Sequence, residues 1–476
     1  MAKTILAIDI GSTKVSAVIA EINEQGVISI TGHGFAKSMG VKKGIITNIE
    51  LASKCVKKAL SDARRIAGNN ISVATVSISN AYAKNVNSTG IVNIPNKDIS
   101  IREIKRVMET ALYNANISSD DEVIHVLPYN FRVDDQDFIE DPYGMNASRM
   151  EVDVNIITVQ KSSLSNLKKA IRSAGLDIEA IVLNSYASAI ATMGEDEKEL
   201  GVAVIDMGGQ TSNLVIHIGN SVRFNDYLGV GSNHITNDLS MALHTPLQVA
   251  EQVKIQYGSL TEFSNETIEL PVIGDHDNKN EISLEIVHRV ILARVEEALM
   301  LLSKSLDRSG LRDQIGAGII LTGGMTKLEG MRELAQDIFH GMPVRIAKPW
   351  KIGGLFKNLD DPVYSTIIGL LFYQAGGHTQ YEINNSNNML HHKDDALENT
   401  LSDIALNSSD SDTKDNPYST ESGIYPPQTV QDNKDNKSTK SGVSNNSDFN
   451  FMDLPNPTEE KSGVVSKFIN WARQLF

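Results

Sequence analysis

The segment "LAIDIGSTKVSAVIAEI" (6–22) consists of an apolar run, a short polar turn after Asp9 and a second apolar run. The same form recurs in "VAVIDMGGQTSNLVIHIG" (202–219), where the turn follows Asp206. Two β-branched runs joined by a glycine-containing turn predict a β-hairpin. Because the pattern occurs twice, the sequence predicts two related halves, each of which begins with such a hairpin.

The two turns have the composition of a phosphate-binding site. Glycine lets backbone N–H groups approach an anion closely, hydroxyl and amide side chains add donors, and lysine adds a positive charge. The candidate phosphate-binding residues are Gly11, Ser12, Thr13, Lys14, Gly208, Gly209, Gln210 and Thr211. Asp9 and Asp206 end the preceding strands, where carboxylates can hold Mg²⁺ through its waters. Two unrelated β-turns are the alternative, which the duplication disfavours.

A third glycine motif lies in "GAGIILTGGMTKLEGM" (316–331). It predicts a buried strand, a turn at Gly323 and Gly324, and then a helix. Small residues at such a turn allow a flat group such as adenine to lie on the backbone. An ordinary strand-to-helix turn is the alternative, and the two preceding hairpins favour nucleotide binding.

Composition excludes several classes of protein. The net charge of −15 and pI near 5.2 argue against nucleic acid as a main partner. Cys55 is the single cysteine, so an intrachain disulfide is impossible; this suits a reducing compartment, and a cysteine-poor secreted protein is the alternative. The N-terminal residues do not have the pattern of a signal peptide. No apolar run reaches the length of about 18 residues that spans a bilayer.

The region from 376 to 460 differs from the rest of the chain. It contains five lysines and fifteen acidic residues, a net charge of −10, and little apolar periodicity. Such a segment buries too little apolar surface to offset the entropy of ordering it, so we expect disorder there. A tether of about 85 residues has a root-mean-square length of roughly 50 Å.

The last residues, "VVSKFINWARQLF" (464–476), separate into an apolar and a polar face on a helical wheel. Basic residues on one face and aromatics on the other are typical of a helix at a membrane surface, here an anionic one. The candidate membrane-binding residues are Val465, Lys467, Phe468, Ile469, Trp471, Arg473, Leu475 and Phe476. Packing on the protein's own body or on a partner is the alternative. One such helix gains little net free energy on binding, so we expect attachment to depend on assembly into polymers.

These motifs together resemble a known superfamily. Asp-x-Gly-Ser-Thr, Asp-x-Gly-Gly-x-Thr and Thr-Gly-Gly in this order are similar to those of actin, Hsp70 and sugar kinases. Segments 125–158, 229–240 and 250–259 resemble the FtsA family of bacterial cell division proteins. The resemblance covers residues 1 to about 375 and the last fourteen.

The resemblance implies an α/β fold: an actin-like, two-lobed ATPase fold with an inserted 1C subdomain, a disordered linker and a C-terminal amphipathic helix. The implied divisions are 1–82, 163–196 and 363–375 for subdomain 1A, 83–162 for 1C, 197–227 and 301–362 for 2A, 228–300 for 2B, 376–462 for the linker and 463–476 for the helix.

The resemblance also assigns roles at the nucleotide. ATP phosphates would lie against the two turns, and Asp9 and Asp206 would position Mg²⁺. The helix of Glu251 and Lys254 would border the ribose and adenine; the alternative is a solvated ion pair. Gly323, Gly324 and Met325 would lie opposite that helix. The residue that orients water would precede the connecting helix near 177–189. The register favours apolar Ala180 there, next to Glu179, so we expect slow ATP hydrolysis or none.

The function that the resemblance implies is that of an adaptor. It would polymerise and anchor FtsZ filaments to the cytoplasmic face of the cell membrane at the division septum. Subdomain 2B would receive the FtsZ C-terminal peptide, with Arg289 as a candidate contact, and 1C would contact neighbouring subunits and later division proteins. A small-molecule kinase and a pilus-assembly ATP-binding protein remain alternatives; an Hsp70-type chaperone would need a substrate-binding β-domain after the ATPase-like body.

Overall fold

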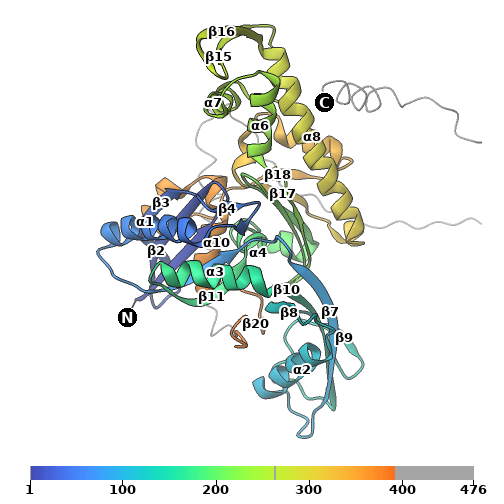
Figure 1. Cartoon of the computed structure of the whole chain (residues 1–476). Helices are drawn as coiled ribbons and strands as arrows, with labels where there is room; N and C mark the ends of the chain where they lie inside the picture. Colours follow the sequence, from blue (N-terminus) through green and yellow to red (C-terminus); the bar gives the residue numbers. More distant parts are fainter. Residues whose placement is uncertain (1, 262–263, 392–476) are drawn as a thin grey trace, which may run out of the picture. The chain divides into compact units, whose positions relative to one another are not determined.

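The computed structural model describes residues 2–261 and 264–391 (Figure 1). Every described residue belongs to the first of the two units into which the chain divides, residues 1–414. The predicted terminal helix over 463–476 lies outside the described residues.

The first half of the chain forms a six-stranded sheet with the order β11-β6-β1-β2-β3-β19. Strands β1, β2 and β3 form an antiparallel meander, and β6 and β11 add to it in parallel. The bounds are β1 (Lys3–Ile10), β2 (Lys14–Ile22), β3 (Ile28–Lys37), β6 (Val73–Ile78), β11 (Asp177–Leu183) and β19 (Gly353–Gly354).

The second half repeats this topology in a sheet with the order β14-β13-β12-β17-β18. Strands β12, β13 and β14 form the antiparallel meander, and β17 and β18 add in parallel. The bounds are β12 (Val202–Met207), β13 (Ser212–Ile218), β14 (Ser221–Leu228), β17 (Gly318–Thr322) and β18 (Val344–Ile346). The internal repeat and both predicted hairpins are therefore confirmed.

Helices cover both faces of the first sheet. Helix α1 (Ile49–Ala67) packs on β2, β3 and α3 (Lys161–Ser173), and α10 (Ser365–Gln374) packs on β1, β6 and α4 (Asn184–Ile190). Helix α10 is buried all round because its sequence is almost entirely apolar. A Cβ atom on Gly369 would lie 1.7 Å from the carbonyl oxygen of Ala187, so only glycine allows α4 and α10 to approach this closely.

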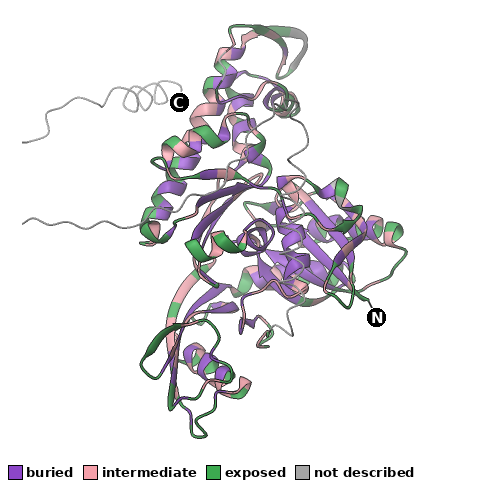
Figure 2. Cartoon of the chain, turned by 180° about the vertical axis from the view of Figure 1, so that it is seen from behind, coloured by how far each residue is buried: buried purple, intermediate pink, exposed green. Residues whose placement is uncertain are grey.

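Successive side chains of β12 point to opposite faces of its sheet and pack in two different hydrophobic cores. Val202 and Val204 belong to the core of the first sheet, whereas Ala203, Ile205 and Met207 belong to a second core. The second core also includes α6 (Ser232–Ala242), α7 (Leu247–Tyr257), α8 (Leu284–Arg308) and α9 (Met331–Ile338). Figure 2 shows that the strands of both sheets are mainly buried. The predicted boundary of subdomain 2B at residue 300 falls inside α8.

A smaller sheet with its own core is built mainly from the segment between β6 and α3, and its strand β20 comes from the end of the described chain. Its order is β20-β8-β10-β7, with β9 paired to β8, and α2 packs on it. The bounds are β7 (Lys84–Asn93), α2 (Ile101–Asn114), β8 (Asp121–Val133), β9 (Gln136–Ile139), β10 (Arg149–Gln160) and β20 (Ile383–Asn384).

The prediction of disorder from residue 376 onward is wrong for residues 376–391, which we call the tail root. Strand β20 pairs with β8, and Tyr381, Glu382 and Ile383 are buried. Its high polar content conceals a short run in which Tyr381 and Glu382 are hydrogen-bonded and Ile383 packs in the core of the smaller sheet. The rest of the predicted linker, 392–462, lies outside the described residues.

Short elements complete the first unit. They are β4 (Val41–Lys42), β5 (Ile45–Ile46), β15 (Thr267–Val272), β16 (Asp275–Ser283), α5 (Glu195–Leu200), and the 3₁₀ helices η1 (Arg312–Gln314), η2 (Gly324–Lys327), η3 (Leu355–Leu359) and η4 (Pro362–Tyr364). Among the helices of the described residues, none is long and apolar enough to cross a membrane.

Candidate functional site

The turns of the two repeated hairpins meet in the structure. A Cβ atom on Gly209 would lie 1.9 Å from Thr13 Oγ1, so these residues are in direct contact. Each turn is closed in the same way: the Gly11 N–H donates to the carbonyl of Lys14 (3.0 Å), and the Gly208 N–H donates to that of Thr211 (2.8 Å). The structure thus brings the two predicted phosphate-binding segments together.

The loop between β4 and β5 joins both turns. The Lys43 N–H donates to Gln210 Oε1 (2.8 Å), and the Gly44 N–H donates to Ser12 Oγ (3.0 Å). One residue from each turn therefore accepts a hydrogen bond from the same short loop, which fixes the turns relative to each other.

Asp9 lies at the end of β1 and is almost completely buried, with 8% of its surface exposed. Ser77, at the end of the parallel strand β6, donates to Asp9 Oδ1 (2.8 Å). Burial raises the pKa of Asp9 to about 6, although the Ser77 hydroxyl and the charge of Lys14 oppose the rise. A carboxylate in this environment is stabilised by a nearby cation.

Asp206 occupies the equivalent place in the second half. Ser188 of α4 and Thr366 of α10 both donate to its Oδ2, at 2.6 and 3.0 Å. Burial raises the pKa of Asp206 despite these two donors. A Cβ atom on Gly323 would lie 2.4 Å from Asp206 Oδ1, so the third glycine motif lies directly against the second hairpin.

Lys14 places a positive charge between these groups. Its Nζ lies 3.5 Å from the centroid of the Tyr364 ring and 5.7 Å from that of Phe35. Burial lowers the pKa of Lys14 to about 8. Within the described part of the chain this Nζ is buried and has no hydrogen-bond acceptor. Its donors are thus available to an anion.

The residues around Asp9 and Asp206 fit a hydrated cation better than a fully coordinated one. The described residues contain no group of three or more His, Cys, Asp or Glu side chains placed to hold a metal ion. Ser16 faces Asp9 and Asn213 faces Asp206 across the two hairpins. Ser16 Oγ and Asn213 Oδ1 are buried and have no hydrogen-bond partner in the described structure. Two carboxylates and these free oxygens suit Mg²⁺ held largely through its waters.

Glu251 and Lys254 form an ion pair on α7 in which Lys254 is buried and the Glu251 side chain is 42% exposed. Only 7% of Lys254 is exposed. Its Nζ donates to Glu251 Oε2 (2.7 Å), to Thr236 Oγ1 (2.9 Å) and to the carbonyl of Ser232 (3.2 Å). Ser232 begins α6, and its N–H donates to the carbonyl of Gly208 (3.0 Å). The pair is thus connected through α6 to the second hairpin turn.

The third glycine motif differs in detail from its prediction. Thr322 ends β17, and Gly324 begins the 3₁₀ helix η2 instead of an α-helix; α9 starts at Met331. Met325 is 1% exposed and packs in the second core. Of the three residues predicted here, Gly324 is exposed, Gly323 is buried against Asp206, and the Met325 side chain packs in the core.

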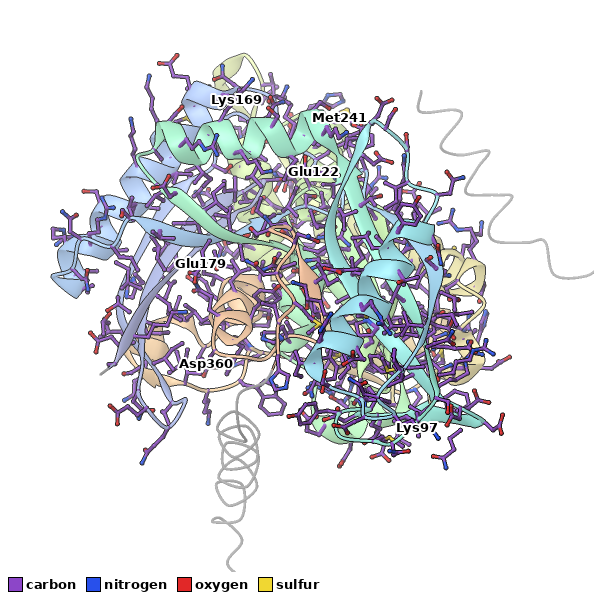
Figure 3. All side chains as sticks on the ribbon, turned by 90° about the horizontal axis from the view of Figure 1, so that it is seen from below. Lys97, Glu122, Lys169, Glu179, Met241 and Asp360 are labelled. Carbon is purple, nitrogen blue, oxygen red and sulfur yellow. The ribbon has the colours of Figure 1, made fainter. Side chains whose placement is uncertain are left out.

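The predicted position of Ala180 before the connecting helix is wrong. Ala180 lies within β11, and α4 begins at Asn184, directly after Leu183. Strand β11 is irregular between Ile178 and Ala180 and continues past Ala180 to Leu183. Glu179, labelled in Figure 3, is exposed on β11 and accepts a hydrogen bond from Gln374 (2.7 Å).

The remaining candidate residues lie away from this site or outside the described residues. Arg289 is on α8, with 70% of its side chain exposed, and forms an ion pair with Glu285 one turn away. The candidate membrane-binding residues of segment 464–476 all lie outside the described residues.

Sequence reasoning missed the side chains that hold the two aspartates and Lys14. Ser77 could have been found, because it lies near the end of a strand parallel to β1 and such ends meet at one edge of a sheet. Ser188, Thr366 and Tyr364 come from distant helical segments, and no spacing connects them to the hairpins.

Comparison with known families identifies the chain's relatives. The family model "Cell division protein FtsA" matches residues 203–369, and "SHS2 domain inserted in FTSA" matches residues 81–158. Cell division protein FtsA of Helicobacter pylori is 37% identical over 423 residues, covering 82% of this chain and 86% of that protein. FtsA of Pseudomonas aeruginosa is 38% identical over 374 residues, covering 78% and 89%. FtsA of Escherichia coli K12 is 30% identical over 389 residues, covering 80% and 92%.

A solved structure supports the fold. A chain of the PilM-PilN type IV pilus biogenesis complex superposes with a TM-score of 0.56 at 16% identity, covering 78% of this chain and 98% of that one. The predicted actin-like, two-lobed α/β fold with an inserted subdomain, here of SHS2 type, is confirmed by these comparisons and by the duplicated sheets. With relatives this similar over most of its length, the chain belongs to the FtsA family of cell division proteins.

Proposed function

We propose that this chain is an ATP-binding, actin-like cell division protein that polymerises and anchors FtsZ filaments to the cytoplasmic face of the cell membrane at the septum. The meeting of the two hairpin turns around Asp9, Lys14 and Asp206 carries the nucleotide part of the proposal. Family membership supports the role in division, and favours it over a small-molecule kinase or a pilus-assembly protein.

Different residues of the site would bind different parts of ATP. Backbone N–H groups of the two turns, with Ser12, Thr13, Gln210 and Thr211, donate to phosphate oxygens. Lys14 neutralises phosphate charge, and Asp9 and Asp206 would hold the waters of Mg²⁺. The cation would supply positive charge that offsets the charge of the phosphates. Glu251 and Lys254 stabilise the helix that borders the ribose and adenine, with Gly323 and Gly324 on the other side.

The membrane part of the proposal rests on sequence. Segment 463–476 combines aromatic and aliphatic residues on one face with Lys467 and Arg473 on the other. Burying its large apolar side chains gains about 1.5–3 kcal/mol each when complete, and ordering thirteen residues costs about 1 kcal/mol each. These terms nearly cancel, so a single copy binds weakly and a polymer that presents many copies binds strongly.

Partner contacts complete the proposal. The region of α6, α7, β15, β16 and α8 would receive the acidic and apolar C-terminal peptide of FtsZ. The exposed guanidinium of Arg289 is a candidate contact for that peptide. The SHS2 domain would contact neighbouring subunits and later division proteins.

Vesicle co-sedimentation tests the proposal. The full chain and a version ending at Ser462 are mixed with vesicles containing anionic lipid, with and without ATP and Mg²⁺. We expect only the full chain to pellet with vesicles, and more of it with ATP and Mg²⁺. If the shortened version pellets equally, the terminal segment is not the anchor. A variant that no longer forms polymers but binds vesicles as tightly as the parent would contradict the coupling to assembly.

A further inference from the structure

A buried carboxylate lies in the tail root. Glu382 is 0% exposed, and both of its oxygens are hydrogen-bonded. His125 Nδ1 and the Tyr373 hydroxyl contact Oε1, at 2.6 and 2.7 Å, and the Tyr186 hydroxyl donates to Oε2 (3.0 Å). We call these four residues the Glu382 cluster. Burial and the charge of Glu382 raise the pKa of the Tyr186 and Tyr373 hydroxyls well above the ordinary value for tyrosine. Both hydroxyls therefore stay protonated and act as hydrogen-bond donors.

The cluster joins three parts of the molecule that are far apart in sequence. His125 is on β8 of the SHS2 domain, Tyr186 is on α4 and Tyr373 is on α10. His125 is held from its other side as well, because the Leu183 N–H contacts its Nε2 (3.1 Å). The tail root therefore connects the inserted domain to the body of the protein through groups that are almost completely buried.

The same two helices also hold the candidate metal-binding carboxylate. Ser188 of α4 and Thr366 of α10 donate to Asp206. Each helix thus contacts Asp206 through one side chain and Glu382 through another: Ser188 and Tyr186 on α4, Thr366 and Tyr373 on α10.

Close packing makes α4 and α10 behave as one body. Gly369 lies against the backbone of Ala187, with no space for even a methyl group between the helices. Ser188 Oγ and Thr366 Oγ1 also contact each other, at 2.9 Å. A displacement of these hydroxyls at Asp206 is therefore transmitted to Tyr186 and Tyr373 instead of being absorbed between the helices.

We propose that Glu382 is a positioning residue for the nucleotide site, and that this site and the tail root are thermodynamically coupled through α4 and α10. The inference rests on the proposed binding of ATP and Mg²⁺ at Asp206. Ser188 and Thr366 orient the Asp206 carboxylate, so firmly held α4 and α10 helices keep it in place for the hydrated cation. Because coupling between two sites is reciprocal, nucleotide binding in turn orders the tail root, and an intact Glu382 cluster tightens nucleotide binding.

The position of the tail root determines which parts of the protein this coupling would affect. The root leads directly into residues 392–476, which include the candidate membrane-binding segment. Its strand β20 pairs with β8 of the SHS2 domain. Nucleotide state would thereby set how firmly the attachment point of the tail and the SHS2 domain are held to the body.

The test compares two substitutions in the full chain. Glu382→Gln removes the buried charge and keeps the size of the side chain, and Glu199→Gln changes an exposed glutamate on α5 as the matched control. The dissociation constant for ATP with Mg²⁺ is measured by titration calorimetry. Hydrogen exchange is followed in peptides from 376–391 and from β8, with and without nucleotide.

We expect nucleotide to slow exchange in the tail root of the parent and of Glu199→Gln. Glu382→Gln should weaken binding at least about fivefold and lose this nucleotide-dependent protection. Equal dissociation constants and equal protection in the two variants would overturn the coupling. Failure of the parent itself to bind ATP would instead refute the proposed function.

A second pair of variants tests the coupling between the nucleotide site and the tail root if Glu382→Gln does not fold. Tyr373→Phe removes one hydrogen bond to Glu382 and keeps the ring, and Tyr113→Phe removes the hydroxyl of a tyrosine on α2 that is 89% exposed. Weaker nucleotide binding and reduced nucleotide-dependent protection in Tyr373→Phe alone support the proposal. Identical behaviour of the two tyrosine variants rejects it.

Discussion

The ammonium group of Lys14 lies 3.5 Å from the centroid of the Tyr364 ring. This cation–π contact stabilises the charge without using any of its hydrogen-bond donors. Tyr364 ends the 3₁₀ helix η4, which immediately precedes α10. Lys14 is therefore held in place at the turn of the first hairpin while its donors stay available for phosphate.

Nucleotide binding should weaken as the pH rises above 8. The pKa of Lys14 is lowered to about 8 by burial, so the free protein loses this positive charge between pH 7 and pH 9. Phosphate binds the protonated form, and binding above pH 8 must therefore take up a proton. We expect the dissociation constant for ATP with Mg²⁺ to rise about tenfold between pH 8 and pH 9.5, measured by titration at constant free Mg²⁺.

Lys14→Arg is the control for that profile. Arginine remains charged throughout this pH range and also stacks on an aromatic ring. The Lys14→Arg variant should bind ATP with little dependence on pH, although its absolute affinity changes with the new geometry. A profile in Lys14→Arg as steep as that of the parent would show that another group titrates.

The contact between Thr13 and Gly209 should be sensitive to a single methyl group. Gly209→Ala puts a Cβ atom 1.9 Å from Thr13 Oγ1, so the two hairpin turns must separate. We expect the free energy of unfolding to fall by about 1–3 kcal/mol and ATP binding to weaken. Chemical denaturation and calorimetry measure the two effects.

A double-mutant cycle assigns that effect to the contact. Thr13→Ala removes the hydroxyl that the new methyl group meets, so the double variant should be more stable than Gly209→Ala alone. Gly194→Ala is the matched glycine control, because its Cβ atom would meet Glu197 Oε2 at an ordinary 3.6 Å. Purely additive effects of the two substitutions would contradict a direct contact.

The hairpins and their duplication could be predicted because each is a local pattern. A β-branched run, a glycine turn and a second run specify a hairpin within about twenty residues, and repetition of the pattern predicts the repeated topology. Ser188 and Thr366, which hold Asp206, could not be predicted in this way. Their place depends on how α4 packs against α10, and that packing depends on one glycine, Gly369.

The tail root shows that average composition can fail to predict an ordered segment. Average polarity from residue 376 onward predicts disorder, yet Glu382 and Tyr381 are buried. A buried charged residue is tolerated only when its hydrogen bonds are satisfied, and the partners of Glu382 are at positions 125, 186 and 373. Nothing in the sequence near residue 382 indicates these partners.

Asp9 should destabilise the protein when no nucleotide is bound. Its pKa is raised from 3.8 in the unfolded chain to about 6 in the fold, so the folded state binds more protons between these values. The contribution of Asp9 to stability is therefore lost as the pH rises from 4 to 6. Asp9→Asn should be more stable than the parent by about 3 kcal/mol at pH 7 and by about half as much at pH 5.

Chemical denaturation at the two pH values checks this prediction, with Asp135→Asn as the control at an exposed aspartate. Addition of ATP and Mg²⁺ should raise the stability of the parent more than that of Asp9→Asn, because the carboxylate that holds the waters of the cation is absent from the variant. An Asp9→Asn protein that is less stable than the parent at pH 7 would contradict the buried charge as the cause.

Hydrolysis should be slow, and Glu179 should not contribute to it. Efficient attack on a γ-phosphate needs a side chain that orients water. Glu179 is exposed on β11 and is engaged by Gln374 and Lys3, whereas the residue directly before α4 is the apolar Leu183. We expect phosphate release below about one turnover per minute, since no acidic side chain stands at that position.

Glu179→Gln should release phosphate at the rate of the parent. Asp206→Asn, in which cation binding is impaired, gives the background rate of phosphate release. A large loss of turnover in Glu179→Gln would instead show that β11 rearranges when nucleotide binds.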